Sequence, residues 1–427
     1  MSEQKTQTTA RNGQVSYRGC KLMGSVELRP EIVYILGAGF SYDAGVPLQS
    51  QILGSIRQFE LMDLPSLLSE RFLTAQSKIF DFIDKIFQEV PNPRLEDVFT
   101  IIDQNIQRRS YCVGYDWQEL EVVHNALLNA IMLLFHTHES QIPPEAQEFY
   151  RSVAGYFVEE RVNAGQKGHP FSIISLNWDC VLEDAIYWFL EQCGGNKVDI
   201  DYCCYTTPLE GTSRHTPSIN QKAMRLFNTK FIKLHGSVNC VVCPNCNRLY
   251  TGLGAPRELL EEYIAGKICP RCCSVRGVAG STALNEPALE PLIISPTFIK
   301  EFNNAHIQMI WHNAYIDLCE AKKVVFVGYS LPEADYHLRT LLKRAIRKDA
   351  ELVVVLTKKD KPPTNCEEHI REKYAASRYS AFFGSAPDTN IRFEFGGVKS
   401  YFRDVVESER LGQRIEHLRG LFANTRG

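Results

Sequence analysis

The sequence predicts an α/β fold in which a doubly wound parallel sheet carries a helical insertion and a small cysteine-rich lobe. Apolar runs typical of buried parallel strands alternate with helical patterns along the chain, as they do in sheets that have helices on both faces. A stretch from about 50 to 165 has apolar residues three and four apart, which indicates amphipathic helices. Residues 240–275 hold two C-x-x-C pairs, which are typical of a metal-bound lobe.

Size and charge narrow the class of protein. The chain has 427 residues, a formal net charge of -3 and 44% hydrophobic residues, a balance that suits a globular protein with its own core. This near-neutral charge gives no bulk attraction to nucleic acid or anionic membranes. No run approaches 18 apolar residues and the first residues lack an apolar secretory core, so we expect neither a spanning helix nor export. The expected location is the cytoplasm, where the 14 cysteines stay reduced.

The first half of the chain is expected to supply two strands of the sheet and the helical insertion. Residues 1–28 are polar and predict a mobile arm that precedes the main domain, residues 29–360. The run 31–36 predicts a buried strand leading into a tight glycine turn, and 171–176 predicts a second strand. The helical insertion, about 50–165, lies between these two strands.

The second half continues the alternation of strands and helices. The short strand 231–234 runs directly into the cysteine-rich segment, about 240–275. Further strands of the parallel sheet are expected at 291–294, 323–327 and 351–356, the first two followed by helices. Residues 361–427 are expected to form a C-terminal α/β extension that ends in a helix.

Glycine-rich or polar turns follow five of the predicted strands. The carboxyl ends of parallel strands meet at one edge of the sheet, where open α/β folds bind their ligands. We therefore take residues of these turns as candidates for a site. In chain order they are Gly37, Ala38, Gly39, Ser41, Asn177, Asp179, His235, Gly328, Ser330 and Thr357.

Each of these turns also has a simpler structural interpretation. The glycine turn would let the backbone approach a pyrophosphate, but the third glycine of a dinucleotide fingerprint would fall at Tyr42, so a turn without a ligand stays open. Asn177 could serve only to cap the following helix. His235 could accept a proton from a hydroxyl group or a water near neutral pH, although a lone histidine in a turn is more often structural.

The sharpest signal is the pair of C-x-x-C motifs, which have 22 residues between them. This spacing is close to that of zinc ribbons, and four thiolates would close the shell of a tetrahedral, structural Zn²⁺. The candidate zinc ligands are Cys243, Cys246, Cys269 and Cys272. The alternative is a redox C-x-x-C, which would need one pair at a helix start beside a strand. Cys240 and Cys273 are neighbours that could replace one of the ligands.

Taken in order, these motifs resemble those of the sirtuin family, the silent-information-regulator type of NAD-dependent enzymes. The resemblance spans about residues 31–358. Its motifs are the glycine turn 37–47, Asn177-Trp-Asp179, Leu234-His-Gly-Ser237 followed by the cysteine pairs, Gly328-Tyr-Ser-Leu331 and Val355-Leu-Thr357. The resemblance implies a Rossmann-like domain that binds NAD⁺ in the crevice of the sheet, together with a small zinc-ribbon lobe.

The resemblance also implies a role for each candidate residue. The phosphates would be lined by Gly37, Ala38, Gly39 and Ser41. The nicotinamide ribose would lie beside Asn177 and Asp179, and His235 would be the catalytic histidine. The adenosine side would be held by Gly328, Ser330 and Thr357.

Some features depart from the protein-deacylating sirtuins. Those enzymes have Asp-Phe-Arg after Gly-x-Pro, whereas Pro47 is followed here by Leu-Gln-Ser. They also carry a Phe-Gly-Glu segment that helps form the acyl-peptide groove, and the corresponding stretch here is Ile-Ser-Pro-Thr-Phe, 294–298. With the large helical insertion and the segments 95–99 and 328–335, the chain more closely resembles bacterial sirtuin-like proteins that hydrolyse free NAD⁺ in antiviral defence.

The expected function is therefore that of an NAD⁺ glycohydrolase, which yields nicotinamide and ADP-ribose. The barrier is oxocarbenium character at ribose C1′, so Asn177 would position the ribose and a water while His235 acts as general base. The alternatives are an NAD-dependent protein deacylase and a non-catalytic sensor of NAD or ADP-ribose. Since unrestrained NAD⁺ hydrolysis would kill the cell, the resemblance implies a latent antiphage effector. We expect a homo-oligomer, activated by a separately encoded partner such as an ATPase or a nuclease.

Overall fold

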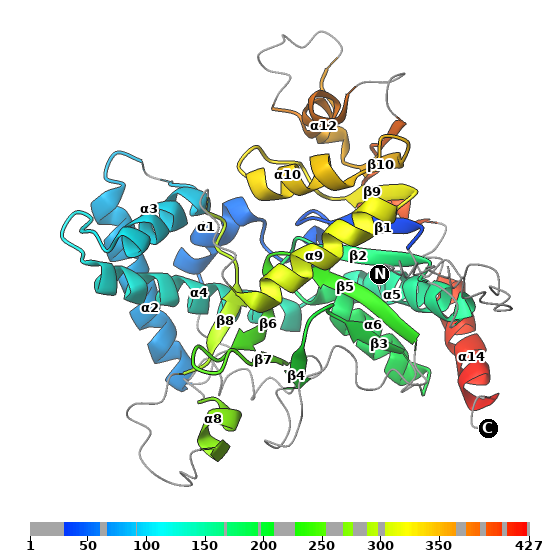
Figure 1. The fold of residues 1–427 in the computed structure, drawn as a ribbon, viewed down its shortest axis with the longest axis horizontal. Helices are drawn as coiled ribbons and strands as arrows, with labels where there is room; N and C mark the ends of the chain where they lie inside the picture. The colour runs from blue at the N-terminus through cyan, green and yellow to red at the C-terminus, as the bar shows by residue number, and fades with distance from the viewer. Residues whose placement is uncertain are drawn as a thin grey trace, which may run out of the picture.

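The computed structural model describes most of the chain between residues 30 and 424 (Figure 1). The described ranges are 30–59, 66–90, 92–165, 169–194, 198–208, 227–252, 268–275, 288–297, 304–363, 373–384, 390–403 and 408–424. The predicted mobile arm, 1–28, lies outside the described residues, as do Phe298 and the middle of the cysteine-rich segment.

The core of the fold is a seven-stranded sheet in which each strand runs parallel to its neighbours. In spatial order the strands are β11 (Ile391–Glu394), β10 (Glu351–Val355), β9 (Lys323–Val327), β1 (Ile32–Leu36), β2 (Phe171–Ser175), β5 (Phe227–Lys233) and β3 (Val198–Asp201). The chain first fills the β2 side of β1 and then crosses to the β9 side. The strand order therefore reverses between β1 and β9, and such switch points are where open α/β sheets bind ligands.

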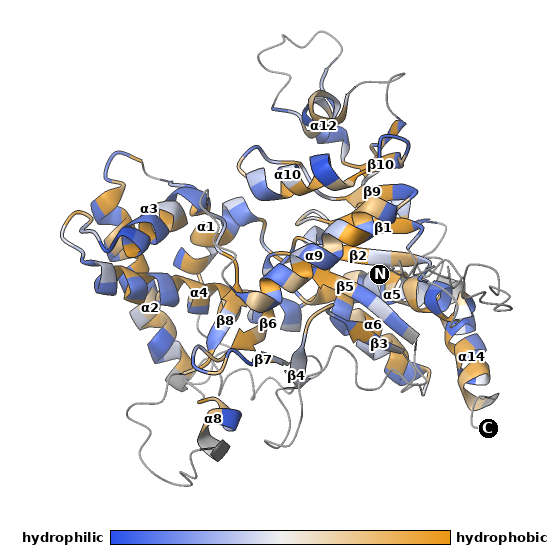
Figure 2. Cartoon of the chain, viewed as in Figure 1, coloured by the Kyte–Doolittle hydropathy of each residue, from blue (hydrophilic) through white to orange (hydrophobic). Residues whose placement is uncertain are grey.

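Helices cover both faces of this sheet, so the predicted doubly wound architecture is confirmed. One face carries α5 (Pro144–Asn163), α6 (Val181–Gln192) and α14 (Ser408–Asn424), and the other carries α9 (Ala305–Glu320), α10 (Tyr336–Ala345) and α12 (Ala375–Phe383). Tyr34 of β1 packs on Phe157 of α5, whereas Phe326 of β9 packs on Tyr379 of α12. Because Phe326 is level with Ile35 and not with Tyr34, these two aromatic residues point to opposite faces. In Figure 2 the central strands are mostly coloured as apolar.

Four helices form a separate block beside the sheet, at the left of Figure 1. This helical block consists of α1 (Ile52–Arg57), α2 (Ser66–Ile86), α3 (Leu95–Arg108) and α4 (Trp117–Ser140). Helix α4 begins with a capping box in which Asp116 and Glu119 each accept the other's backbone amide, at 2.8 Å. Among the described helices, α4 is long and apolar enough to cross a bilayer, but 67% of its most apolar window is buried inside the protein, as in a core helix.

A second, four-stranded sheet lies below the main sheet in Figure 1. Its order is β4 (Thr206–Pro208), β7 (Leu249–Thr251), β6 (Gly236–Val242) and β8 (Glu290–Ile293), and the short helix α8 (Pro270–Val275) lies beside it. The prediction that 291–294 belongs to the parallel sheet is wrong, because β8 pairs antiparallel with β6. Gly236 explains this pairing: its φ of 76° turns the chain out of the main sheet three residues after the end of β5. The apolar pattern of residues 291–294 fits a strand of either sheet, so the sequence alone does not distinguish between them.

Shorter elements complete the described structure. They are the 3₁₀ helices η1 (Tyr42–Ala44), η2 (Gln49–Gln51) and η5 (Lys358–Asp360), and the short helix α13 (Gly397–Tyr401). The C-terminal extension adds β11 to the edge of the main sheet and packs α14 against α5. Helix α5, which falls inside the predicted insertion, packs on the main sheet, whereas α1 to α4 do not cover it. The domain boundaries given above stay predictions.

Candidate functional site

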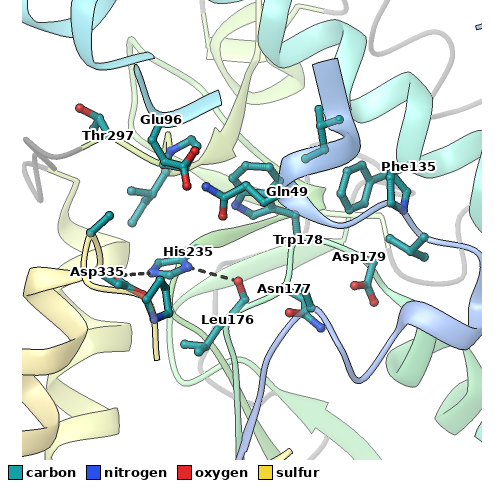
Figure 3. Close-up of a pocket in the computed structure, with 18 residues that line it drawn as sticks. Gln49, Glu96, Phe135, Leu176, Asn177, Trp178, Asp179, His235, Thr297 and Asp335 are labelled. Carbon is teal, nitrogen blue, oxygen red and sulfur yellow. Dashed lines mark hydrogen bonds and ion pairs between the residues drawn. The ribbon is translucent and has the colours of Figure 1, made fainter. Parts of the chain in front are cut away.

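A cavity lies at the carboxyl ends of β1, β2, β5 and β9, next to the point where the strand order reverses (Figure 3). Ala38 follows β1, Asn177 follows β2, His235 follows β5 and Asp335 lies in the loop after β9, and all four line the cavity. The helical block contributes Glu96 from the first turn of α3. Four of the predicted strand-end turns thus meet around one cavity.

The glycines beside the cavity are required by the packing of the protein itself. The amides of Gly37 and Gly39 donate to the carbonyls of Val327 and Gly328, at 3.0 and 2.9 Å. Gly328 has a φ of 64°, and a Cβ there would lie 2.4 Å from the amide nitrogen of Phe40. The glycine turn then leads into η1, which has only three residues. It therefore lacks the long helix whose N-terminus usually meets a pyrophosphate, and the close contact of two strand-end turns accounts for these glycines.

Asn177 is held in a buried hydrogen-bond network at the end of β2. Its side-chain nitrogen donates to the carbonyl of Gly37 at 3.0 Å and to Ser41 Oγ at 3.3 Å. Ser41 Oγ donates to Asp179 at 2.9 Å, and the same carboxylate oxygen accepts the amide of Val181, the first residue of α6. Asp179 therefore accepts a backbone amide at the start of α6, the role that Asn177 was considered for, and Asn177 does not. The Ser41 hydroxyl, which was expected beside a phosphate, is buried between the two side chains.

A buried ion pair supports this network. Lys233 of β5 is 2% exposed, and its Nζ donates to Glu183 at 2.8 Å and to the backbone carbonyl of Asp179. Burial raises the pKa of Glu183 and of Asp179, and the positive charge of Lys233 opposes both shifts. The ion pair joins the start of α6 to the end of β5, so it fixes the two strand ends that carry Asp179 and His235.

His235 lies at the junction of the two sheets, between β5 and β6. Its Nδ1 is 3.2 Å from the carbonyl oxygen of Leu176 and donates to it, which leaves the lone pair of the neutral ring on Nε2. That Nε2 lies 3.8 Å from Asp335 Oδ1, and the Tyr329 hydroxyl donates to the other Asp335 oxygen at 3.1 Å. Burial raises the pKa of Tyr329, so the phenol stays a donor. The arrangement fixes the ring and can stabilise it after it takes up a proton.

Two carboxyl groups of the cavity, those of Glu96 and Asp335, are missing from the sequence prediction. With Asp179 they make three, and the described residues that line the cavity include no lysine or arginine. Such a lining favours a positively charged group and disfavours a phosphate. Both residues lie in segments that contributed to the resemblance, 95–99 and 328–335. No sequence pattern indicated, however, that the helical insertion reaches the edge of the sheet.

Six of the predicted residues lie outside the described lining of the cavity, namely Gly37, Gly39, Ser41, Gly328, Ser330 and Thr357. Ser330 is exposed, and its carbonyl accepts two hydrogen bonds from Arg378, at 2.9 and 3.0 Å. Thr357 is also exposed and donates its hydroxyl to Asp360 at 2.6 Å. Both residues follow strands at the same sheet edge as the cavity. Their expected contact with the adenosine side of a nucleotide stays a prediction.

The four predicted zinc ligands meet in the cysteine-rich lobe. The Sγ atoms of Cys243 and Cys272 are 3.8 Å apart, those of Cys246 and Cys269 are 3.7 Å apart, and all four lie within 4.8 Å of one another. Zn–S bonds of about 2.3 Å in a tetrahedron place the sulfur atoms about 3.8 Å apart. The residues present therefore fit a closed, structural zinc site.

The surroundings of the four thiols agree with this ligand set. Tyr250 Oη is 3.2 Å from Cys269 Sγ, a contact of the kind by which a neighbouring side chain orients a metal ligand. Cys240 is buried on β6, where its thiol donates to Asn239, and it does not join the four. The side chain of Cys273 lies outside the described residues.

Comparison with known proteins gives distant structural likenesses. No family model and no curated protein matches the chain. A Sir2 homologue in complex with NAD is similar, with 13% identity over 95% of this chain and 96% of that chain, and a TM-score of 0.38. Sir2Tm bound to a propionylated peptide has 14% identity, coverage of 90% and 94%, and a TM-score of 0.35. A complex of Sir2, a p53 peptide and NAD⁺ has 13% identity, coverage of 91% and 93%, and a TM-score of 0.35. At these scores, function has to be inferred from the cavity.

Proposed function

We propose that this chain is an NAD⁺ glycohydrolase that releases nicotinamide from NAD⁺ and leaves ADP-ribose. The observation that supports the proposal is the cavity at the switch point, whose described lining combines three carboxyl groups and a histidine with no lysine or arginine. The nicotinamide ring of NAD⁺ is the cationic end of the molecule and suits this lining, whereas the phosphates suit a position outside it.

The reaction breaks the bond between ribose C1′ and the ring nitrogen of nicotinamide. The bonding electron pair stays on that nitrogen, so nicotinamide leaves as a neutral molecule without being protonated. Positive charge then develops on C1′ and the ribose ring oxygen, and a water oxygen forms the new bond to C1′. The protein has to orient the ribose, stabilise that charge and accept one proton from the water.

His235 is assigned to proton acceptance. Its Nδ1 is occupied by the carbonyl of Leu176, so Nε2 is the basic atom, and Asp335 lies beside Nε2 where it stabilises the imidazolium. Asn177 is assigned to positioning of the ribose and the water. Its amide nitrogen is committed to Gly37 and Ser41, so the amide oxygen is the atom available to a hydroxyl group.

The segment 294–297, which forms part of the cavity lining, favours hydrolysis over deacylation. The Thr297 hydroxyl donates to Thr100 of α3 at 3.2 Å, and Ser295 Oγ is 3.4 Å from His124 Nε2 of α4. The stretch that the resemblance aligns with an acyl-peptide groove thus makes side-chain contacts with α3 and α4 of the helical block. An extended peptide would have to displace these contacts, whereas a water would not.

The cellular role that we propose is a latent effector of antiphage defence. The helical block is where we place a homo-oligomer contact or the contact of a separately encoded activator, because its helices α1, α3 and α4 bring Ile52, Glu96 and Phe135 to the cavity while the block does not cover the main sheet. A shift of the block would then change the cavity without altering the main sheet.

The test is to incubate the purified chain with NAD⁺ and follow nicotinamide release by chromatography, alone and with products of neighbouring genes. Asn177→Ala and His235→Ala should abolish release while ADP-ribose still binds. Full activity in both variants would refute the assignment. NAD⁺-dependent removal of acyl groups from a peptide panel would favour the deacylase, and NAD⁺ binding without turnover under every condition would favour the sensor.

A further inference from the structure

Glu96 stands apart from the other carboxyl groups of the cavity. Asp179 accepts hydrogen bonds from Ser41 and Val181, and Asp335 accepts one from Tyr329 and faces His235. For the Glu96 carboxylate, no hydrogen-bond or ion-pair partner is found within the described part of the chain. Figure 3 shows it pointing into the cavity from the side opposite Asn177.

The position of Glu96 on its helix offers one structural explanation. Glu96 lies in the first turn of α3, where a negative charge is stabilised by the helix dipole. Asp97 in the same turn has that benefit as well, and its carboxylate pairs with Arg94 at 2.8 and 2.9 Å. Asp97 therefore already places a negative charge at the start of α3, and its own ion pair keeps it there. The helix dipole thus does not explain why Glu96 points into the cavity.

We propose that Glu96 is a catalytic residue that stabilises positive charge at the reacting end of the nucleotide. The proposal rests on the glycohydrolase function proposed above. In bound NAD⁺ the charge is on the nicotinamide ring, and as the C1′–N bond breaks it moves to the ribose. A carboxylate that points into the cavity favours both states over a neutral ligand, and Glu96 forms no covalent bond in this step. The substrate class is oxidised pyridinium nucleotides, with exclusion of the neutral dihydro forms.

The kinetic test compares Glu96→Gln with Asp97→Asn in the full-length chain, under the conditions that activate the wild type. Both variants remove one charge from the first turn of α3, so a helix-dipole effect would be shared between them. We expect Glu96→Gln to lower kcat by about 10²- to 10³-fold with a smaller change in KM, and to leave ADP-ribose affinity unaltered. Asp97→Asn should keep kcat within about twofold of the wild type. A Glu96→Gln variant with wild-type kcat would overturn the catalytic role.

A binding measurement decides the question if the wild type proves inactive. Calorimetric titration with NAD⁺ and with NADH gives the preference for the cationic ring. Glu96→Gln should reduce that preference by about tenfold, and Asp97→Asn should leave it unchanged. An unaltered preference in Glu96→Gln would overturn the proposal. A wild type that stays inactive under every condition, with the candidate activators present, but whose Glu96→Gln variant shows the expected loss of preference would refute the glycohydrolase function and leave the recognition role of Glu96 standing.

Discussion

At the scale of single residues, the candidate site contains two side chains, those of His235 and Asn177, that neighbouring groups hold in place. His235 is fixed by a backbone carbonyl on one nitrogen and faces a carboxylate with the other. Asn177 is fixed through Ser41, which Asp179 anchors. A residue that acts on one of these side chains should therefore affect turnover more than substrate binding, and this difference can be measured.

Asp335 is the first such residue. We expect Asp335→Asn to lower kcat by about 10²-fold with little change in KM, because the amide no longer stabilises the imidazolium of His235. Asp335→Glu should recover part of the loss. Tyr329→Phe removes only one neutral hydrogen-bond donor to Asp335 and should cost about tenfold or less. Steady-state kinetics of nicotinamide release check the order of these effects. An Asp335→Asn variant changed in KM alone would contradict the assignment.

Lys233 tests the buried ion pair. Lys233→Met leaves Glu183 without its partner, and we expect the free energy of unfolding to fall by about 3–5 kcal/mol. Lys322→Met is the matched surface control: Lys322 pairs with Glu31 at 3.0 Å, but both side chains are exposed, so its loss should cost less than about 1 kcal/mol. Denaturant titration measures both. Equal losses of unfolding free energy in the two variants would show that burial does not increase the cost of removing one partner of an ion pair.

The sequence could predict the residues that follow strand ends, because a buried strand and the polar turn after it are local patterns. Asn177 and His235 were found in this way, and both line the cavity. Such local patterns could not identify Glu96, because its position depends on how α3 packs against the end of the sheet. The predicted contact of Ser41 with a phosphate stays a prediction, and its hydrogen bonds to Asn177 and Asp179 could not be predicted because these side chains lie far away in sequence.

At the scale of elements, β1 and β9 are joined at their ends by glycines that leave no room for a side chain. Gly328→Ala adds a Cβ 2.4 Å from the Phe40 amide at a φ of 64°, so we expect a loss of about 3 kcal/mol or more in the free energy of unfolding. Gly412→Ala in α14, where nothing lies within 4 Å, should instead raise stability by about 0.5–1 kcal/mol. Thermal unfolding of both variants is the check. A neutral Gly328→Ala would show that the two turns can separate.

Periodicity predicted the type of most elements but not their partners. The helical pattern of α3 and α4 and the apolar runs of β1, β2, β9 and β10 agree with the structure. The run 291–294 was assigned to the wrong sheet because its partner, β6, is selected by the turn at Gly236 and not by the composition of the strand. The cysteine spacing succeeded because a tetrahedral metal site constrains four residues directly.

At the scale of the whole molecule, the cavity and the cysteine lobe share one continuous stretch of chain. β5 ends at Lys233, His235 forms the turn, and β6 then runs to Val242, next to the first zinc ligand. The amide of Ile294, just after β8, donates to the carbonyl of His235 at 2.9 Å. The sheet that leads to the four cysteines thus also supports the turn that carries His235.

This connection predicts that zinc supports catalysis from a distance. We expect one zinc ion per chain, lost in Cys243→Ser and kept in Cys240→Ser, because Cys240 lies outside the ligand group. Loss of zinc should lower nicotinamide release, since β6 and β8 would no longer hold the turn at His235. Co²⁺ should restore activity, because the metal acts only through structure. Metal analysis alongside the NAD⁺ assay is the measurement. A zinc-free chain with wild-type turnover would show instead that the lobe and the cavity are independent.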